Sequence, residues 1–142
     1  MNRRTLGRGR LLVSVGALLM LLSMALPWWR HGGSPGLPEV TVTGLAGAGI
    51  VVFLAAVLAL ALVVLPFTTA DRPLAIDRPA SFVVVTVLGA IGFVVTLLQI
   101  VEPGGLSAVW RPDRSPGLWL AAIGLGLMAW GTSELLSERP RR

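Results

Sequence analysis

Four long stretches of this chain contain no charged residue, and this feature constrains the fold more than any other. They cover residues 11–29, 43–67, 79–101 and 115–133. A helix of about 20 residues, rising 1.5 Å per residue, crosses the roughly 30 Å hydrocarbon core of a bilayer. A charge at the centre of such a helix costs roughly 2.5–3.5 kcal/mol. Four uncharged stretches of this length therefore predict four transmembrane spans.

The composition is typical of a protein whose surface mostly faces lipid. Charged residues make up 13% of the 142 residues, which is about half the share found in soluble domains. All basic residues are arginines, and they lie in the connections rather than on one face. Nucleic-acid binding requires such a face, so no nucleic-acid partner is expected. The expected partners are the lipid bilayer and either another membrane protein or further copies of this chain.

Short connections between the spans predict an antiparallel four-helix transmembrane bundle, an all-α fold with a single domain over residues 1–142. The arginines determine its orientation. One side carries Arg3, Arg4, Arg8, Arg10, Arg72, Arg78, Arg139, Arg141 and Arg142, and the other carries Arg30, Arg111 and Arg114. The positive-inside rule therefore predicts a multi-pass protein of the plasma membrane, a bacterial inner membrane, with both termini in the cytoplasm.

The N-terminal segment also has features of a cleavable signal peptide. An arginine-rich flank precedes an apolar stretch, and Ser23 and Ala25 have the spacing of a cleavage site. However, Pro27 and the bulky Trp28 follow closely, and the apolar run is longer than a usual signal core. These features favour a first span that is not cleaved.

Small residues recur at helical spacing within three of the predicted spans. In lipid, apolar side chains gain little by leaving the bilayer, so helices pack through small residues that let their backbones approach closely. The residues expected at helix contacts are Gly44, Ala48, Gly89, Gly92, Gly117, Gly124 and Gly131. Thr96 and Gln99 are expected to make a polar contact within the membrane. The alternative for Gln99 is a polar cap at the membrane interface.

Tryptophans gather near the outer ends of the predicted spans. The indole ring favours the headgroup layer, where its apolar body is buried and its N–H is hydrated. Trp28 and Trp29 are therefore expected to anchor the first span at the interface. The alternative is an outer-face patch that binds a lipid or a partner protein, formed by Trp28, Trp29, His31, Trp110 and Trp119.

The connection between the first two spans contains the segment EVTVTG at residues 39–44. Polar and β-branched residues alternate along it, which predicts a short β-strand. An ordered segment here would make the first outer loop a structured cap, which favours a role in interaction. Thr43, at the end of this segment, is also expected to cap the second helix.

An LPW sequence ends the first span, and a TG pair opens the second span after a loop rich in Gly and Pro. In these residues (Leu26, Pro27, Trp28, Thr43 and Gly44) the chain resembles a group of small four-span membrane proteins common in actinobacteria. The resemblance covers roughly the first half of the chain. It implies a location in the membrane and brings no activity with it.

The spans offer little for catalysis or for proton-coupled transport. Catalysis requires nucleophiles, bases or metals placed together, and the polar side chains within the spans are those of Ser, Thr and Gln99. His31 is the only histidine, and there is no cysteine. No catalytic, cofactor-binding or metal-binding residues are therefore expected, and the chain is not expected to be an enzyme. Proton-coupled transport usually depends on an ionisable residue inside the membrane, and the spans contain none.

These exclusions favour a non-catalytic integral membrane protein that serves as an accessory or scaffold subunit of a larger membrane complex. Two alternatives stay open. One is a small oligomeric transporter or pore, which would need a continuous polar track. The other is a lipid or envelope sensor that acts through the outer Trp-rich loops.

Overall fold

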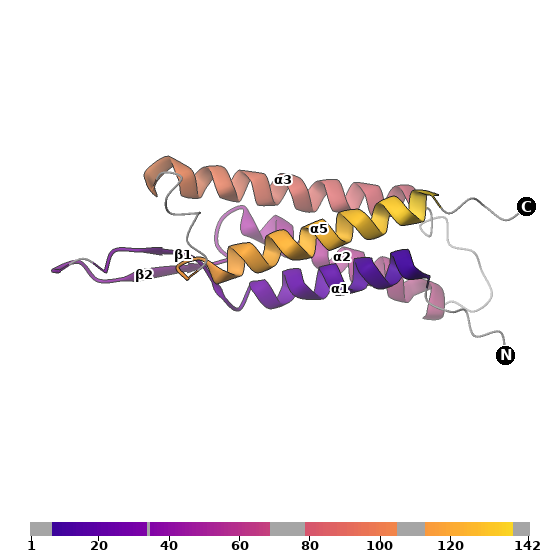
Figure 1. Ribbon diagram of the computed structural model, residues 1–142, viewed down its shortest axis with the longest axis horizontal. Helices are drawn as coiled ribbons and strands as arrows, with labels where there is room; N and C mark the ends of the chain where they lie inside the picture. Colours follow the sequence, from indigo (N-terminus) through magenta and orange to yellow (C-terminus); the bar gives the residue numbers. More distant parts are fainter. Residues whose placement is uncertain (1–6, 34, 69–78, 105–112, 138–142) are drawn as a thin grey trace, which may run out of the picture.

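The computed structural model describes residues 7–33, 35–68, 79–104 and 113–137, and four helices account for most of them. These are α1 (Arg8–Ser23), α2 (Gly49–Thr68), α3 (Pro79–Gly104) and α5 (Pro116–Ser137). They lie side by side and alternate in direction (Figure 1). Helices α1 and α3 each pack on both α2 and α5.

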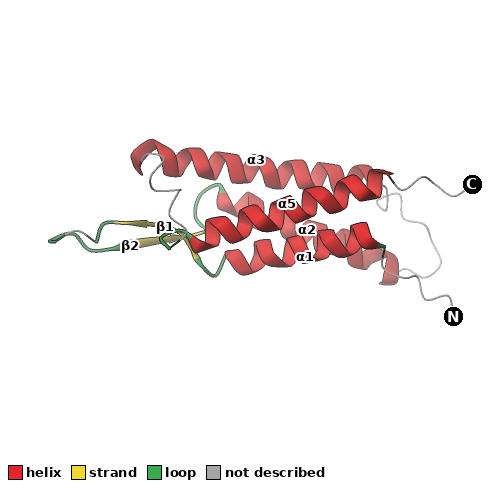
Figure 2. Cartoon of the chain, in the orientation of Figure 1, coloured by secondary structure: helices red, strands yellow, loops and turns green. Residues whose placement is uncertain are grey.

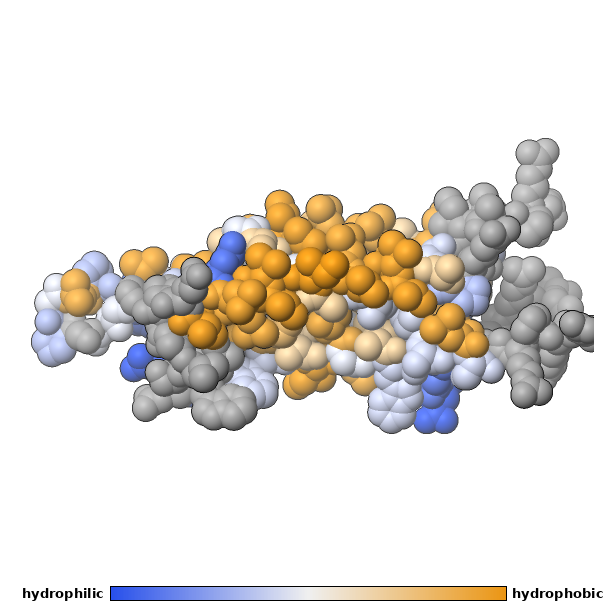
Figure 3. All heavy atoms as spheres, turned by 90° about the horizontal axis from the view of Figure 1, so that it is seen from above, coloured by the Kyte–Doolittle hydropathy of each residue, from blue (hydrophilic) through white to orange (hydrophobic). Residues whose placement is uncertain are grey.

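Three of the helices are long and apolar enough to cross a membrane, over Gly49–Phe67, Pro79–Val101 and Pro116–Ser137. Leucine, valine and isoleucine side chains on their outer faces are exposed, for example Leu54, Val84 and Ile123. On the face shown in Figure 3, apolar side chains cover the middle of the molecule. Burying such a surface in lipid is favourable and leaving it in water is not. The chain is accordingly a membrane protein, as the uncharged stretches predict.

The first predicted span is shorter as a helix than expected. Helix α1 ends at Ser23, and the next residues continue as turns with i to i+3 hydrogen bonds, the last from Leu26 N–H to the Ser23 carbonyl. Pro27 causes this ending, because proline has no backbone N–H and disfavours helical geometry in the residue before it. The 16 residues of α1 are about 24 Å long, so this helix alone falls short of a full span.

The second predicted span begins later than expected. Thr43 ends a strand and does not cap a helix, and α2 begins at Gly49. Between them the chain turns tightly through bonds from Ala46 N–H to the Thr43 carbonyl and from Gly49 N–H to the Ala46 carbonyl. Gly47 has a φ of +59°, a left-handed conformation that residues other than glycine rarely adopt. Gly44 and Ala48 therefore lie in this turn and not on a helical face.

A β-hairpin projects from one end of the bundle (Figure 2). Its strands are β1 (Pro27–His31) and β2 (Val40–Thr43), which pair antiparallel. The structure confirms the strand predicted within EVTVTG. Strand β1 was not predicted, because its apolar start was assigned to the first span. The end where the hairpin leaves the bundle is called the hairpin end below, and the other is called the opposite end.

Helices α1 and α5 pack through small residues spaced seven apart on both. Gly9 faces Gly131, Gly16 faces Gly124, and the carbonyl oxygen of Ser23 faces Gly117. A Cβ atom built on Gly124 would lie 2.6 Å from the Gly16 carbonyl oxygen, and one on Gly16 would lie 2.5 Å from the Gly124 oxygen. Only a hydrogen fits in these places. A seven-residue repeat on both partners is the pattern of a left-handed helix pair.

Helices α2 and α3 also pack closely, through glycines of α3. A Cβ on Gly92 would lie 2.8 Å from the Cβ of Val51, and one on Gly89 would lie 3.3 Å from the Cβ of Ala55. Small residues on both sides of the bundle thus let neighbouring backbones approach, as helix association in lipid requires.

Candidate functional site

Trp28 fills the centre of the hairpin end. It is only 1% exposed, and its Nε1–H donates to the Ser23 carbonyl oxygen over 2.9 Å. Its ring lies edge-on to that of Phe93 on α3, with centroids 6.2 Å apart. Cβ atoms built on Gly44 or on Gly117 would each lie 2.5 Å from the indole, so these two glycines leave the space that the ring occupies.

The buried position of Trp28 follows from the strand that carries it. In the pairing of β1 with β2, Pro27 lies opposite Thr43 and Trp29 lies opposite Val42, so Trp28 is an extra residue in a β-bulge. Bulges bend a strand and redirect the side chain. Here the bulge turns the indole into the bundle, which fixes the hairpin to α1, α3 and α5 together.

The structure corrects the prediction for Trp28. The expected roles were an interfacial anchor or part of an outer-face patch, and both need an exposed ring. The ring is buried and its N–H is bonded to protein. Gly44 and Gly117 make room for the buried indole because they have no side chains. The sequence does not show that these two glycines lie beside Trp28.

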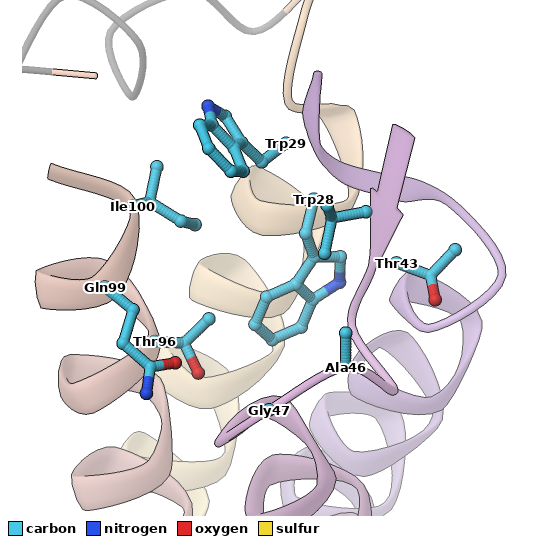
Figure 4. Close-up of a pocket in the computed structure, with 9 residues that line it drawn as sticks. Trp28, Trp29, Thr43, Ala46, Gly47, Thr96, Gln99 and Ile100 are labelled. Atoms are coloured by element: carbon cyan, nitrogen blue, oxygen red, sulfur yellow. The ribbon is translucent and has the colours of Figure 1, made fainter. Parts of the chain in front are cut away.

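Trp29 is half-buried and forms one wall of a pocket at the hairpin end (Figure 4). The pocket has a volume of about 180 Å³. It lies between the base of the hairpin, the turn before α2 and the last turns of α3. The residues that line it are Trp28, Trp29, Val42, Thr43, Ala46, Gly47, Thr96, Gln99 and Ile100.

The two predicted intramembrane polar residues, Thr96 and Gln99, both line this pocket but differ in their surroundings. Thr96 is buried, and its hydroxyl donates to the Gly92 carbonyl of its own helix over 2.8 Å. Gln99 is exposed at the rim, and its Oε1 atom lies 3.2 Å from where a Cβ of Gly47 would be. The amide of Gln99 therefore faces the turn before α2 across the pocket mouth.

The hairpin extends beyond the helices and keeps much of its surface exposed. Leu37 is 65% exposed and Val40 is 55% exposed. Arg30 and Glu39 form an ion pair across the strands, with Nη1 and Oε1 3.7 Å apart. Within the described residues the sheet has only these two strands, and β1 also packs against α5. A further strand would therefore add at the outer edge of β2.

Two other predicted interaction residues, His31 and Trp119, lie on the hairpin and on α5. Register places His31 opposite Val40, away from the helices along the hairpin. Trp119 is half-buried in the first turns of α5. Trp110 lies outside the described residues. The structure thus brings Trp28 and Trp29 together at the pocket, and it places His31 on the projecting hairpin.

The predicted helix-packing glycines lie at helix contacts on α3 and α5. Gly89 and Gly92 face α2, and Gly117, Gly124 and Gly131 face α1 or Trp28. The α1 side of this contact was missed in the sequence, although Gly9, Gly16 and Ser23 carry the same seven-residue spacing. Gly9 lies between Arg8 and Arg10, outside the uncharged stretch that predicts the first span.

Buried hydroxyls in the described helices are satisfied locally. Ser23 donates to the Met20 carbonyl, and Thr132 donates to the Met128 carbonyl and also meets Thr86 of α3 with 2.9 Å between hydroxyls. Among the described residues there is no group of three His, Cys, Asp or Glu side chains that could hold a metal ion. The features available for binding at the hairpin end are the pocket, the exposed apolar side chains and the outer edge of β2.

Comparisons with family models, with curated proteins and with solved structures give no match to this chain.

Proposed function

We propose that this chain is a four-span integral membrane protein of a bacterial inner membrane and a non-catalytic accessory or scaffold subunit of a larger membrane complex. Its first span is α1 extended by residues 24–28, and both termini face the cytoplasm. The hairpin is the element that it offers to a partner protein on the outer side.

The packing of α1 on α5 supports the fourth span. Their contacts extend from Gly9 with Gly131 to Ser23 with Gly117, which is most of the length of a helix able to cross a membrane. Over this length, helix α1 therefore lies at the same depth in the membrane as α5. The apolar residues 24–28 continue to the hairpin end and complete the crossing.

The distribution of arginine supports the orientation. Arg8 and Arg10 begin α1 at the opposite end, where α5 also ends. There the Nε atom of Arg8 lies 3.8 Å from Oε1 of Glu134, and the Trp130 Nε1–H donates to the same oxygen over 3.2 Å. An arginine-rich end with a tryptophan at its border is typical of the cytoplasmic interface.

The observation that carries the scaffold proposal is the attachment of the hairpin to the bundle core through Trp28. A hairpin alone is marginally stable in water, but this one is held by a buried indole and its bond to Ser23. It presents exposed Leu37 and Val40 together with the outer edge of β2. Partner chains bind such edges by adding a strand, with apolar side chains providing specificity.

The helix interior favours a scaffold over a pore. A pore needs polar groups that face a continuous path, whereas the buried hydroxyls of Ser23, Thr96 and Thr132 bond carbonyls of their own helices. Within the described residues, no buried side-chain nitrogen or oxygen lacks a hydrogen-bond partner. The packed interior offers no such groups to a passing ion or solute.

The test is to tag the C-terminus, extract native membranes gently and identify proteins that copurify in stoichiometric amount. The double variant Leu37→Ser with Val40→Ser should lose the partner while the bundle stays folded. The control is Leu136→Ser, an equally exposed leucine near the opposite end, which should keep the partner. If the wild-type protein purifies alone, or if the hairpin variant keeps the partner, the proposal is wrong.

A further inference from the structure

We propose that the pocket beneath Trp29 binds one ester-linked acyl chain of a bilayer lipid. This site is separate from the exposed hairpin that is proposed to contact a partner protein. The pocket volume is about 180 Å³, and an apolar cavity of about 150 Å³ already accepts a molecule the size of benzene. The pocket therefore has room for a segment of one chain but not for a whole lipid.

The inner surface of the pocket is apolar. Its floor is formed by Trp28 and Ile100, which are 1% and 6% exposed, and Trp29 forms the wall above them (Figure 4). The hydroxyl of Thr96, which is buried in the lining, is already bonded to the Gly92 carbonyl. The floor thus suits methylene groups better than water, which needs two or more polar partners in a buried site.

The exposed rim of the pocket at Gln99 adjoins the lipid-facing surface between α2 and α3. Val51 and Gly92 mark the contact of these helices. Three residues further along each helix lie Leu54 and Val95, which helical geometry places on the same flank of that contact. They are 50% and 39% exposed. Val95 is one turn before Gln99, so a chain that leaves the pocket reaches apolar surface immediately.

Gln99 provides a polar group at the depth where lipid esters lie. The membrane-crossing stretch of α3 ends at Val101, which puts Gln99 close to the boundary between hydrocarbon and headgroups. A glutamine amide donates two hydrogen bonds through its nitrogen. An ester carbonyl accepts such a bond, and the chain attached to it then extends along Val95 towards the middle of the membrane.

A lipid is favoured over a partner side chain by the surface beside the rim. The rim at Gln99 adjoins the exposed Val95 on α3, whereas the exposed Leu37 and Val40 lie out on the hairpin. A protein partner that binds the hairpin would not have to reach this flank. The occupant that is always present there is the lipid itself.

Occupancy can be tested by native mass spectrometry of the whole protein in mild detergent, with added phosphatidylglycerol as the probe. The wild-type protein should retain one lipid per chain. Ala46→Phe fills the pocket and should lower the retained fraction by about tenfold. The matched control is Val94→Phe, which should retain the lipid. Val94 is exposed and lies two residues from Gly92, so helical geometry puts it on the side of α3 opposite the α2 contact. Equal retention by both variants, or no lipid on the wild type, overturns the proposal.

A second variant separates a polar contact from simple filling of the pocket. Gln99→Leu is at an exposed rim position, so it should fold even if Ala46→Phe does not. The wild-type protein should prefer an ester-linked lipid over its ether-linked analogue by about fivefold, the effect of one ordinary hydrogen bond. Gln99→Leu should bind both equally. A wild-type protein that does not discriminate between them contradicts the role of Gln99, and a copurified protein in place of the lipid contradicts the ligand class.

Discussion

Two glycines of α5 that lie only two residues apart should respond to alanine in opposite directions. A Cβ at Gly124 would lie 2.6 Å from the Gly16 carbonyl oxygen, which is about 0.8 Å closer than an ordinary contact. The obstacle is backbone, so no rotamer change relieves it and the two helices must separate. A gap of 0.5–1 Å forfeits roughly a quarter to a half of the dispersion energy of the atoms involved. Gly124→Ala should therefore destabilise the bundle by about 1–3 kcal/mol.

Gly126 is the matched control, because a Cβ there has nothing within 4 Å. Alanine has a higher helix propensity than glycine by up to about 1 kcal/mol, so Gly126→Ala should be neutral or stabilising. The assay is equilibrium unfolding in mixed micelles at increasing denaturing-detergent content, followed by far-UV circular dichroism. If Gly124→Ala is as stable as Gly126→Ala, the close contact of α1 with α5 is refuted.

Three further substitutions test other contacts. Trp28→Phe removes the indole bond to Ser23 and should cost about 1–3 kcal/mol, with faster proteolysis of the hairpin as the readout. Thr132→Val removes the hydroxyl contact with Thr86 and should cost about 0.6 kcal/mol in the micelle unfolding assay, the usual size for a hydrogen bond between helices in a membrane. Glu134→Gln should change stability by less than about 1 kcal/mol in the same assay, because Arg8, its ion-pair partner, is 78% exposed.

The presence of the four helices was predictable from charge alone, whereas the end of α1 and the start of α2 were not. Gaps in the charge pattern locate residues that can enter lipid, and α3 begins at Pro79 as that pattern predicts. The same pattern cannot distinguish an apolar helix from an apolar strand. The segment from Pro27 to Trp29 is as uncharged as the helix before it, so it was assigned to the first span although it begins β1.

The sequence predicted the α5 side of the packing between α1 and α5, but not the α1 side. Gly117, Gly124 and Gly131 stood out because they recur every seven residues within an uncharged stretch. Their partners begin at Gly9, beside Arg8 and Arg10, where charge marked the segment as a flank. The contact becomes apparent only when the seven-residue repeats of α1 and α5 are aligned in opposite directions. The repeat in one span does not indicate which other span it contacts.

The position of Trp28 shows why the site could not be predicted from residue types. Tryptophan near a span end usually lies at the interface, because its N–H needs a partner and water supplies one there. In this chain the Ser23 carbonyl supplies that partner, and the absence of side chains at Gly44 and Gly117 supplies the space. Both conditions depend on segments distant in sequence that meet only after the bundle forms.

The physics of the bilayer explains why the β-hairpin and the pocket lie at one end of the bundle and not on the helix faces. Leucine and valine side chains on the helix faces are as well solvated by lipid as by protein, so many sequences serve equally well there. Beyond the hydrocarbon, water again penalises exposed apolar groups and unpaired backbone groups. The hairpin therefore needs a defined fold, which the bulge at Trp28 and the pairing with Val40–Thr43 provide. Among the described residues, Leu37 and Val40 are the large apolar side chains that stay exposed on the hairpin, and the proposed scaffold role assigns them to a partner.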